Sequence, residues 1–275
     1  MLVFPNAKLN LGLHITARRP DGFHSLETVM VPLPWTDALE VLPLPAAAEP
    51  TLTLTGRPVP GDSATNLCLL AYELLRADFP RVPAVALHLH KVVPIGAGLG
   101  GGSGDAAFAL RALNTVLALN LSDDALENYA RQLGSDCAFF IRNQPALALG
   151  RGDDLSPLPL PQLAGTACKV IYPGLHISTV EAYAGVTPRA PQHELRAALA
   201  GPVASWRATV VNDFEAALHP RFPVLAELKA QLYAAGAAYA SLSGSGSAVF
   251  GLWPGQEAPP ALPLPAAYEV WDGRL

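Results

Sequence analysis

The stretch Pro94-Ile-Gly-Ala-Gly-Leu-Gly-Gly-Gly-Ser-Gly-Asp-Ala-Ala107 decides the fold prediction for this chain. Six of the nine residues from 96 to 104 are glycine. Residues 85–93, ahead of it, have the β-branched side chains and partial alternation of a strand, and residues 106–119, behind it, are rich in Ala and Leu at helical spacing. The pattern predicts a strand, a glycine loop and the N-terminus of a helix.

A loop of this kind is suited to bind phosphate. Glycines lack Cβ atoms, so several backbone N–H groups can approach a ligand closely, and the unpaired amides of the first helical turn add partial positive charge. We therefore predict a phosphate cradle. The alternative is a flexible glycine linker, which the apolar and periodic flanking segments make less favourable.

Two familiar nucleotide motifs do not fit the loop. Gly96, Gly98 and Gly101 satisfy G-x-G-x-x-G, and Asp123 lies about 20 residues further on. A Rossmann unit needs a second strand after the helix, however, and residues 120–124 instead predict the start of another helix. A Walker A loop closes with Gly-Lys-Ser/Thr, which does not follow these glycines.

Length and composition predict a globular protein of about two domains. The chain has 275 residues, and its composition changes beyond Gly150 to Pro-rich joints and new strands. We therefore expect domains at residues 1–150 and 151–275. With 51% hydrophobic and 15% charged residues, the composition predicts a compact folded chain and argues against disorder. A net charge of −5 without a Lys/Arg stripe predicts no nucleic-acid partner.

Cysteine usage and the N-terminus predict a cytoplasmic protein. Cys68, Cys137 and Cys168 are widely spaced and form no C-x-x-C pair, so we expect neither a disulfide framework nor a zinc site. The first residues lack a basic signal region, and no run of about 18 apolar residues occurs, so no membrane partner is expected.

Residues 4–16 predict a strand with one apolar and one polar face. Lys8 and Asn10 alternate with Leu9 and Leu11. The two polar side chains therefore share a face and can project together into a cleft. The alternative is that Lys8 is an ordinary solvated strand lysine.

Asp136 stands directly before an apolar run and just after Gly134, where a helix is expected to end in a left-handed cap. A carboxylate that enters an apolar segment is costly unless it is paired or hydrogen-bonded. Asp136 is thus a candidate functional residue. The alternative is that it caps the next short helix.

A second glycine-rich turn, residues 242–247, has the sequence Leu-Ser-Gly-Ser-Gly-Ser. It predicts either a plain hairpin turn or the second side of a phosphate site. Other strands are predicted at residues 25–34, 35–44 and 167–172, and other helices at residues 67–76, 124–133, 179–183, 194–200 and 224–235. Ser63 or Thr65 is expected to cap the helix at residues 67–76.

Three motifs together resemble those of the GHMP kinase superfamily. They are Pro-Asn-Ala-Lys-Leu-Asn at residues 5–10, Pro-x-Gly-x-Gly-Leu-Gly-Gly-Gly-Ser at residues 94–103, and the turn at residues 242–247. Asp-Gly-Phe-His at residues 21–24, Gln-Leu-Gly-Ser-Asp at 132–136 and Pro-Gly-x-x-Ile-Ser-Thr at 173–179 narrow the resemblance. These segments resemble the branch that uses ATP to phosphorylate the 2-hydroxyl of 4-diphosphocytidyl-2-C-methyl-D-erythritol in non-mevalonate isoprenoid synthesis.

The resemblance implies an α+β fold with two domains and an active site between them. The first domain would be like the second domain of ribosomal protein S-five, and the second domain would be ferredoxin-like. ATP and magnesium are the implied cofactors. The sequence does not give the oligomeric state, for which a monomer and a weak dimer both stay open. The sequence does not identify the magnesium ligands.

Site residues follow from the resemblance position by position. Asp136 would be the base and Lys8 its neighbour. The ATP-binding set would be Pro94, Gly96, Gly98, Leu99, Gly100, Gly101, Gly102, Ser103 and Gly104. Asn66, which lies outside these motifs, is a separate candidate for the adenine pocket. The substrate-binding set would be Asn10, Phe23, His24, Thr179, Tyr183, Gly244 and Gly246, with Phe23 and Tyr183 stacking on cytosine.

One position departs from the family pattern, and two rival functions stay open. Family loops commonly continue Gly-Gly-Gly-Ser-Ser, whereas this chain has Gly104 after Ser103.

A GHMP kinase for mevalonate-type or homoserine-type alcohols would share the glycine loop but has no reason to carry residues 21–24. A non-catalytic nucleotide-binding module would not require Lys8 or Asp136.

Overall fold

The strand, glycine loop and helix predicted around residue 94 are present in the computed structural model, which describes residues 1–45 and 48–275. The strand is β6 (Val85–Lys91) and the helix is α2 (Gly101–Val116). The helix begins at Gly101 and not at residue 106 as predicted. Glycine and serine are weak helix formers, so the propensity pattern detected only the Ala/Leu-rich part of α2.

Two compact units divide the described residues, and neither is a continuous half of the chain. Unit 1 comprises Met1–Ala7, Trp35–Ile95 and Gly100–Asn143, and unit 2 comprises Lys8–Pro34, Gly96–Leu99 and Gln144–Leu275. The middle of the glycine loop thus belongs to unit 2, while both of its ends belong to unit 1. The domain boundary that the sequence predicts at residue 150 divides the chain in a different way, and it stays a prediction.

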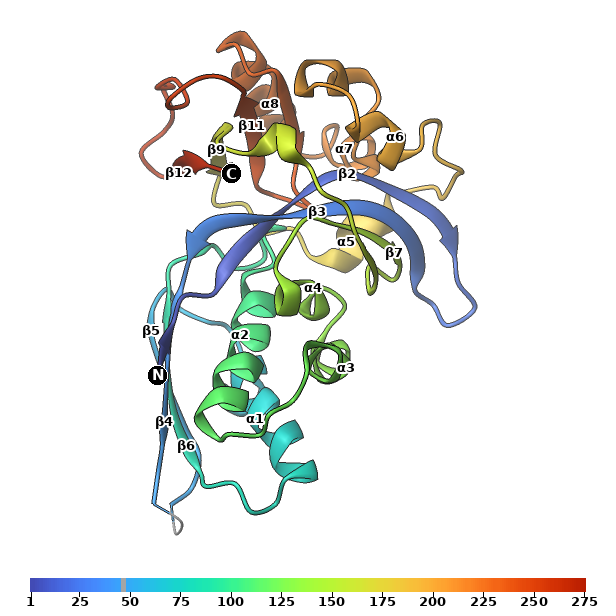
Figure 1. Cartoon of the computed structure of the whole chain (residues 1–275). Helices are drawn as coiled ribbons and strands as arrows, with labels where there is room; N and C mark the ends of the chain where they lie inside the picture. The colour runs from blue at the N-terminus through green and yellow to red at the C-terminus, as the bar shows by residue number, and fades with distance from the viewer. Residues whose placement is uncertain (46–47) are drawn as a thin grey trace. The chain divides into compact units, whose positions relative to one another are not determined.

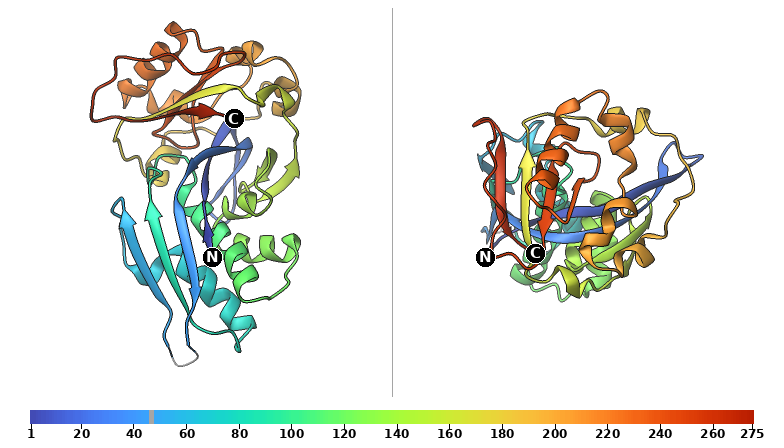
Figure 2. Two further views of the ribbon diagram at one scale, coloured as in Figure 1. Left: turned by 60° about the vertical axis from the view of Figure 1, so that its left-hand side comes forward. Right: turned by 90° about the horizontal axis from the view of Figure 1, so that it is seen from above.

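Unit 1 is a four-stranded sheet with helices on one face (Figures 1 and 2). The strand order is β1-β4-β6-β5, with β1 (Leu2–Val3), β4 (Ala38–Pro43) and β5 (Thr51–Gly56); β5 runs parallel to β6 and the other pairs are antiparallel. The helices are α1 (Leu67–Asp78), α2, α3 (Asp123–Leu133) and α4 (Cys137–Arg142), which pack on one another, and α2 also packs on β4.

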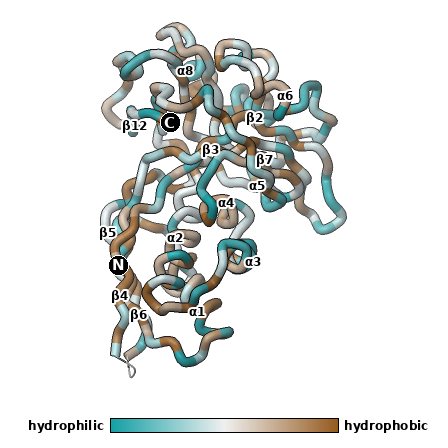
Figure 3. Tube along the Cα trace, viewed as in Figure 1, coloured by the Kyte–Doolittle hydropathy of each residue, from teal (hydrophilic) through white to brown (hydrophobic). Residues whose placement is uncertain are grey.

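Unit 2 contains two four-stranded sheets. The first has the order β2-β3-β7-β8, with β2 (Asn6–Arg18), β3 (His24–Thr36), β7 (Ala146–Gly150) and β8 (Asp154–Pro157). The second has the order β10-β11-β9-β12, all antiparallel, with β9 (Ala167–Tyr172), β10 (Tyr239–Leu242), β11 (Val249–Trp253) and β12 (Glu269–Arg274). The tip between β2 and β3 is hydrophilic in Figure 3, as expected for a solvated turn.

Four helices complete unit 2: α5 (Thr179–Ala184), α6 (Leu195–Leu199), α7 (Asp213–Leu218) and α8 (Pro223–Ala234). Helix α8 packs on β10 and β11, and the core beneath it buries Leu228, Leu242 and Trp253. Burial of these large apolar side chains fixes α8 to the sheet, at about 25 cal/mol per Å² of apolar surface removed from water.

Most predicted elements are confirmed within a few residues, and two predicted caps are wrong. Neither Ser63 nor Thr65 caps α1; both lie in a short 3-10 turn, and Asn66 caps α1 by accepting from the Cys68 N–H at 2.9 Å. Gly134 is extended, with φ of 172°, and is not left-handed. Within residues 1–45 and 48–275, no helix has the length and apolar character needed to span a membrane.

Candidate active site

The glycine loop, residues 94–104, has the backbone that only glycine adopts easily. Gly96, Gly98 and Gly100 have φ values of 69°, 78° and 68°, in the left-handed region. Gly100 is the N-cap of α2 and supplies no side-chain cap, and a Cβ added at Gly102 would meet nothing within 4 Å. The first-turn amides of a 16-residue helix are therefore open to an anion at this point.

A pocket lies within unit 1 beside this helix start. Its wall includes Leu54, Val59 and Ile95 as well as Asn66, and it reaches Gly102. A mainly apolar wall with a few polar groups is typical of a nucleoside site. Since the Asn66 Oδ1 atom already accepts from Cys68, its Nδ2 group is what this side chain offers a ligand.

A buried ion network forms part of the same pocket wall, and the sequence analysis did not identify it. The Lys91 Nζ atom lies 2.5 Å from an Asp37 carboxylate oxygen and 2.6 Å from Asp105. The other Asp37 oxygen accepts from the N–H groups of residues 92 and 93 at 2.5 and 2.9 Å. The network therefore joins the end of β6 to the second turn of α2.

In this network, burial and the ion-pair partners act in opposite directions on the pKa values of Asp105 and Lys91. Burial raises the pKa of the Asp105 carboxyl to about 7, and Lys91 opposes that rise. The pKa of Lys91 is itself raised: burial lowers it, but the two carboxylates outweigh burial. Two buried carboxylates thus share one buried ammonium.

Asp136 is half-buried at the start of α4 and belongs to unit 1. It occupies the N-cap position, but its side chain makes no capping hydrogen bond. The capping alternative is therefore wrong for this side chain. Its predicted role as a base stays a prediction.

Lys8 and Asn10 lie on β2 within unit 2 and are both only 3% exposed, so the solvated alternative for Lys8 is wrong. The Lys8 Nζ atom donates to Asn10 Oδ1 at 2.5 Å and to the Gly98 carbonyl at 3.1 Å. The Asn10 Nδ2 group donates to the Thr28 hydroxyl at 3.0 Å, and this hydroxyl donates to the Gly12 carbonyl at 2.5 Å. This chain of bonds fixes the Asn10 amide so that its oxygen faces Lys8.

The serine-glycine turn, residues 242–247, packs on the same part of the glycine loop. The Ser243 hydroxyl donates to the Gly98 carbonyl at 2.9 Å, and the Ala248 N–H donates to Ala97 O at 3.0 Å. A Cβ on Gly98 would lie 2.0 Å from the Ser243 carbonyl oxygen. Gly244 and Gly246 have φ of 55° and 89°. The two glycine-rich segments, far apart in sequence, are thus adjacent in unit 2.

The residues predicted to bind cytosine all belong to unit 2. His24 stacks on Tyr183, with ring centroids 4.7 Å apart and an interplanar angle of 26°. Phe23 is 55% exposed, and the Arg151 guanidinium lies 5.4 Å from its ring centroid. Thr179 is exposed in the first turn of α5.

Close packing explains why this chain has a glycine at position 104. It is buried, and a Cβ at this position would lie 2.7 Å from the Asn6 carbonyl oxygen. Real Cβ atoms do not approach a backbone atom so closely without a shift of the chain. The glycine therefore allows the N-terminal strand to lie against the first turn of α2, which a serine would disturb.

Two family models match the chain. The model for the GHMP kinases N terminal domain matches residues 66–150, and the model for the GHMP kinases C terminal matches residues 196–262. The first of these ranges holds the pocket residue Asn66, the glycine loop and Asp136, and the second holds the serine-glycine turn.

Named relatives and a solved structure agree with these models. The chain is 49% identical over 253 residues to a 4-diphosphocytidyl-2-C-methyl-D-erythritol kinase from Cytophaga hutchinsonii, with 92% of each chain covered. It is 42% identical to one from Parabacteroides distasonis over the whole of both chains. A crystal structure of 4-(cytidine 5'-diphospho)-2C-methyl-D-erythritol kinase has a TM-score of 0.79 and 35% identity, covering 92% of this chain and 90% of that one.

More distant solved structures share the fold alone. A homoserine kinase from Cytophaga hutchinsonii has a TM-score of 0.69 at 17% identity, covering 98% of this chain and 94% of that one. The two family models match successive parts of the chain, and the Cytophaga hutchinsonii 4-diphosphocytidyl-2-C-methyl-D-erythritol kinase is 49% identical over 92% of it. The chain belongs to the GHMP kinase family.

Proposed function

We propose that this chain transfers the γ-phosphoryl group of ATP to the 2-hydroxyl of 4-diphosphocytidyl-2-C-methyl-D-erythritol, as a kinase of the non-mevalonate isoprenoid pathway. The observation that carries the reaction type is the buried Lys8 ammonium, which Asn10 holds on the Gly98 carbonyl of the glycine loop. Relatives that bear this activity in their names, at 49% identity over 92% of both chains, support the substrate.

Phosphoryl transfer requires in-line positioning and neutralised phosphate charge more than covalent help from the protein. The open first-turn amides of α2 supply fixed partial positive charge, and Lys8 supplies a full charge that Asn10 keeps in one place. The pocket beside Gly102 is the site we propose for the nucleoside of ATP, with Asn66 donating from Nδ2.

Asp136 is the base in this proposal. A carboxylate is too weak to deprotonate an alcohol early, but it can accept the proton late, when the bond to the transferred phosphoryl group is forming in a loose transition state. Asp136 is half-buried at the start of α4, in the same unit as the first turn of α2, and this position supports the role.

Magnesium fits the proposed site as an ion held mainly through ATP. Among residues 1–45 and 48–275, no group of three or more His, Cys, Asp or Glu side chains is arranged to hold a metal. Magnesium is commonly bound by one or two protein oxygens together with substrate phosphates. Ser103 is the oxygen donor that we propose from this chain, and the ion would shield the phosphate charge when bound.

Cytosine recognition is tested by replacing Phe23 with Ala. We expect KM for the cytidyl substrate to rise, since stacking on an exposed ring contributes roughly 1–3 kcal/mol, and kcat to change little. Steady-state kinetics with saturating ATP measure this. Val180→Ala, which shortens another exposed apolar side chain in unit 2, is the control. An unchanged KM for the Phe23 variant would remove the stacking role.

The departure at Gly104 is tested by Gly104→Ser. We expect no tighter binding of ATP or magnesium, because Ser103 and the backbone amides suffice, and we expect a lower Tm because the new Cβ meets the Asn6 carbonyl. Calorimetric titration and thermal unfolding measure the two effects. Gly102→Ser, where a Cβ meets nothing, is the control for stability. Binding tightened more than about tenfold, roughly 1.4 kcal/mol, would show that the glycine costs the chain a ligand contact.

The reaction itself is tested by ADP release from ATP and magnesium with three alcohols at equal concentration: 4-diphosphocytidyl-2-C-methyl-D-erythritol, mevalonate and homoserine. Turnover with the cytidyl compound alone is the expected result. Turnover with another alcohol would keep the kinase and discard the cytosine site. ATP binding without turnover on any of them would favour a nucleotide-binding module.

We further propose a cytoplasmic location and no nucleic-acid partner, on the composition and the three buried free cysteines.

A further inference from the structure

The serine-glycine turn is packed so closely that its position fixes its neighbours. A Cβ on Gly98 would overlap the Ser243 carbonyl, and a Cβ on Gly244 would lie 3.2 Å from both Asn10 Oδ1 and the Gly98 carbonyl oxygen. The Ser243 hydroxyl bonds to the Gly98 carbonyl that also accepts from Lys8. A shift of the turn therefore displaces the groups that hold Lys8.

Asn212 holds this turn from outside. Its Nδ2 group donates to the carbonyl of Leu242 at 3.0 Å and to that of Gly244 at 2.8 Å, one residue on either side of Ser243. Its Oδ1 atom accepts from the Phe214 N–H at 3.0 Å and so caps α7. The residue is 3% exposed. Since both ends of the amide are used, the start of α7 sets the conformation of the turn.

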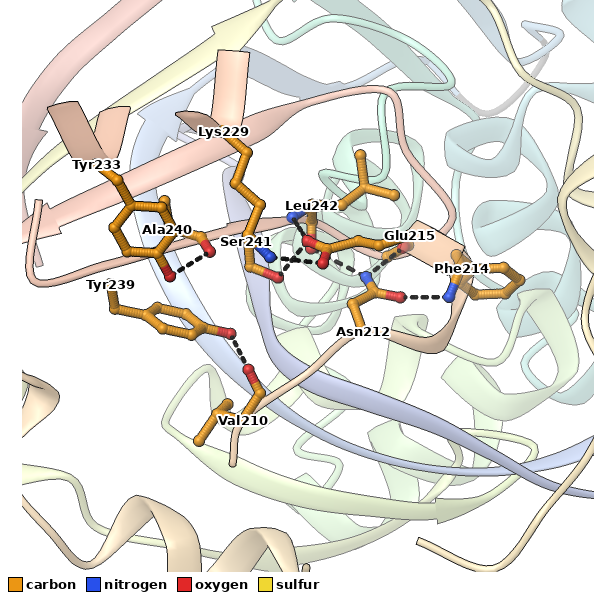
Figure 4. Close-up of polar contacts among 11 residues, drawn as sticks. Val210, Asn212, Phe214, Glu215, Lys229, Tyr233, Tyr239, Ala240, Ser241 and Leu242 are labelled. Carbon is orange, nitrogen blue, oxygen red and sulfur yellow. Dashed lines mark hydrogen bonds and ion pairs between the residues drawn. The ribbon is translucent and has the colours of Figure 1, made fainter. Parts of the chain in front are cut away.

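Glu215, one turn further along the chain, holds the strand that enters the turn. Its Oε1 atom accepts from the Leu242 N–H at 2.9 Å and from the Ser241 hydroxyl at 3.1 Å. Its Oε2 atom accepts from Lys229 Nζ of α8 at 2.6 Å. Figure 4 shows the Asn212 and Glu215 side chains converging on this strand end. Bonds to an ionised acceptor in a buried site are strong and directional.

We propose that Asn212 and Glu215 are positioning residues for phosphoryl transfer: they act through the serine-glycine turn to place Gly98 and, through it, Lys8. This inference rests on the proposed function. Asn212 and Glu215 each bond to the serine-glycine turn, and Ser243 of this turn bonds to Gly98. Their effect on phosphoryl transfer therefore passes through the backbone of the turn and not through contact with a ligand. None of the motifs recognised in the sequence included either residue.

The direct test is Asn212→Ser. Serine caps helices well, so α7 keeps its start, but the shorter side chain cannot donate to both carbonyls of the turn. We expect kcat/KM for the cytidyl substrate to fall at least tenfold and the Kd of MgATP to stay within about threefold, because the nucleoside pocket is built from unit 1 and includes neither residue. Steady-state kinetics and calorimetric titration give the two numbers.

Ser122→Ala is the matched control, because Ser122 caps α3 in unit 1 and has no bond to the turn. Ser122→Ala loses a helix cap without touching the turn and should keep kcat/KM within about twofold, which separates a general loss of stability from a loss of positioning. Kinetics of Asn212→Ser equal to those of the unaltered chain would overturn the inference. An unaltered chain without turnover would instead overturn the proposed function.

Glu215→Gln keeps the test decisive if Asn212→Ser does not fold. The amide keeps the shape and one acceptor oxygen but loses the charge that strengthens the bonds to Leu242 and Ser241. We expect kcat/KM to fall at least threefold with MgATP binding unchanged. A value equal to that of the unaltered chain would overturn the inference as well.

Discussion

Asp136→Asn is expected to lower kcat by about two orders of magnitude or more while leaving ATP binding nearly intact. Asparagine keeps the size of the side chain but cannot accept the proton of the attacking hydroxyl. The side chain makes no capping hydrogen bond to α4, so the substitution takes no side-chain cap from this helix. A hundredfold loss corresponds to about 2.7 kcal/mol of transition-state stabilisation.

The measurement is kcat with both substrates saturating, together with the Kd of MgATP. Asp123→Asn is the control, because Asp123 lies in the first turn of α3 in the same unit and has no proposed part in the reaction. Turnover of the Asp136 variant within about threefold of normal would remove this residue from the mechanism.

Lys91→Met is expected to cause the largest loss of stability. It leaves the Asp37 and Asp105 carboxylates buried without their cation, and breaking a buried ion pair from one side typically costs about 3–5 kcal/mol of unfolding free energy. The pocket proposed for the nucleoside would be affected as well, because Lys91 and Asp105 form part of its wall. Urea unfolding followed by circular dichroism measures the loss.

The loss should also depend on pH in a definite direction. The folded-state pKa of Asp105 is raised from 3.8 to about 7, so its contribution to stability is lost as the pH rises between those values. Without Lys91 this pKa rises further, because the cation that favoured the ionised form is gone. The deficit of the variant should therefore be larger at about pH 8 than at about pH 5.

Lys169→Met is the matched control for this experiment. Lys169 is as buried as Lys91, but its partner Asp272 has a side chain that is 49% exposed and can be hydrated again after the pair is broken. A loss of about 1 kcal/mol or less is expected there. Equal losses for the two lysine variants would contradict the role given to the Asp37–Lys91–Asp105 network.

The local parts of the site could be predicted from the sequence. A run of glycines between an alternating segment and an Ala/Leu-rich one has one simple interpretation, and β6 and α2 are where that interpretation places them, apart from the first turn of α2. Lys8 and Asn10 could be assigned to one strand face because side chains alternate along a strand. These inferences use residues close together in the chain.

The partners of those residues could not be predicted in the same way. Thr28 orients Asn10 from the neighbouring strand, and Asn212 holds a turn 30 residues further along the chain. Lys91 did leave a signal, since it continues the inward parity of Val85, Leu87 and Leu89 on β6, all of them buried. A lysine on a core-facing position predicts a buried counter-ion, but not that Asp37 and Asp105 supply it.

The aromatic group shows where a resemblance stops being specific. Motif positions identify Phe23, His24 and Tyr183, but they do not tell which ring packs on which. In the structure His24 stacks on Tyr183, and Tyr183 also meets Phe214 edge to face at 4.9 Å. Stacking geometry depends on the tertiary placement of α5 and α7, which no local pattern encodes.

The most direct test of the central claim is identification of the product by ³¹P NMR and mass spectrometry after incubation of the chain with ATP, magnesium and 4-diphosphocytidyl-2-C-methyl-D-erythritol. The account predicts one new phosphomonoester on the 2-hydroxyl, formed in equal amount with ADP, and its near absence with the Asp136→Asn variant. A diphosphocytidyl compound recovered unchanged while mevalonate or homoserine becomes phosphorylated would contradict it.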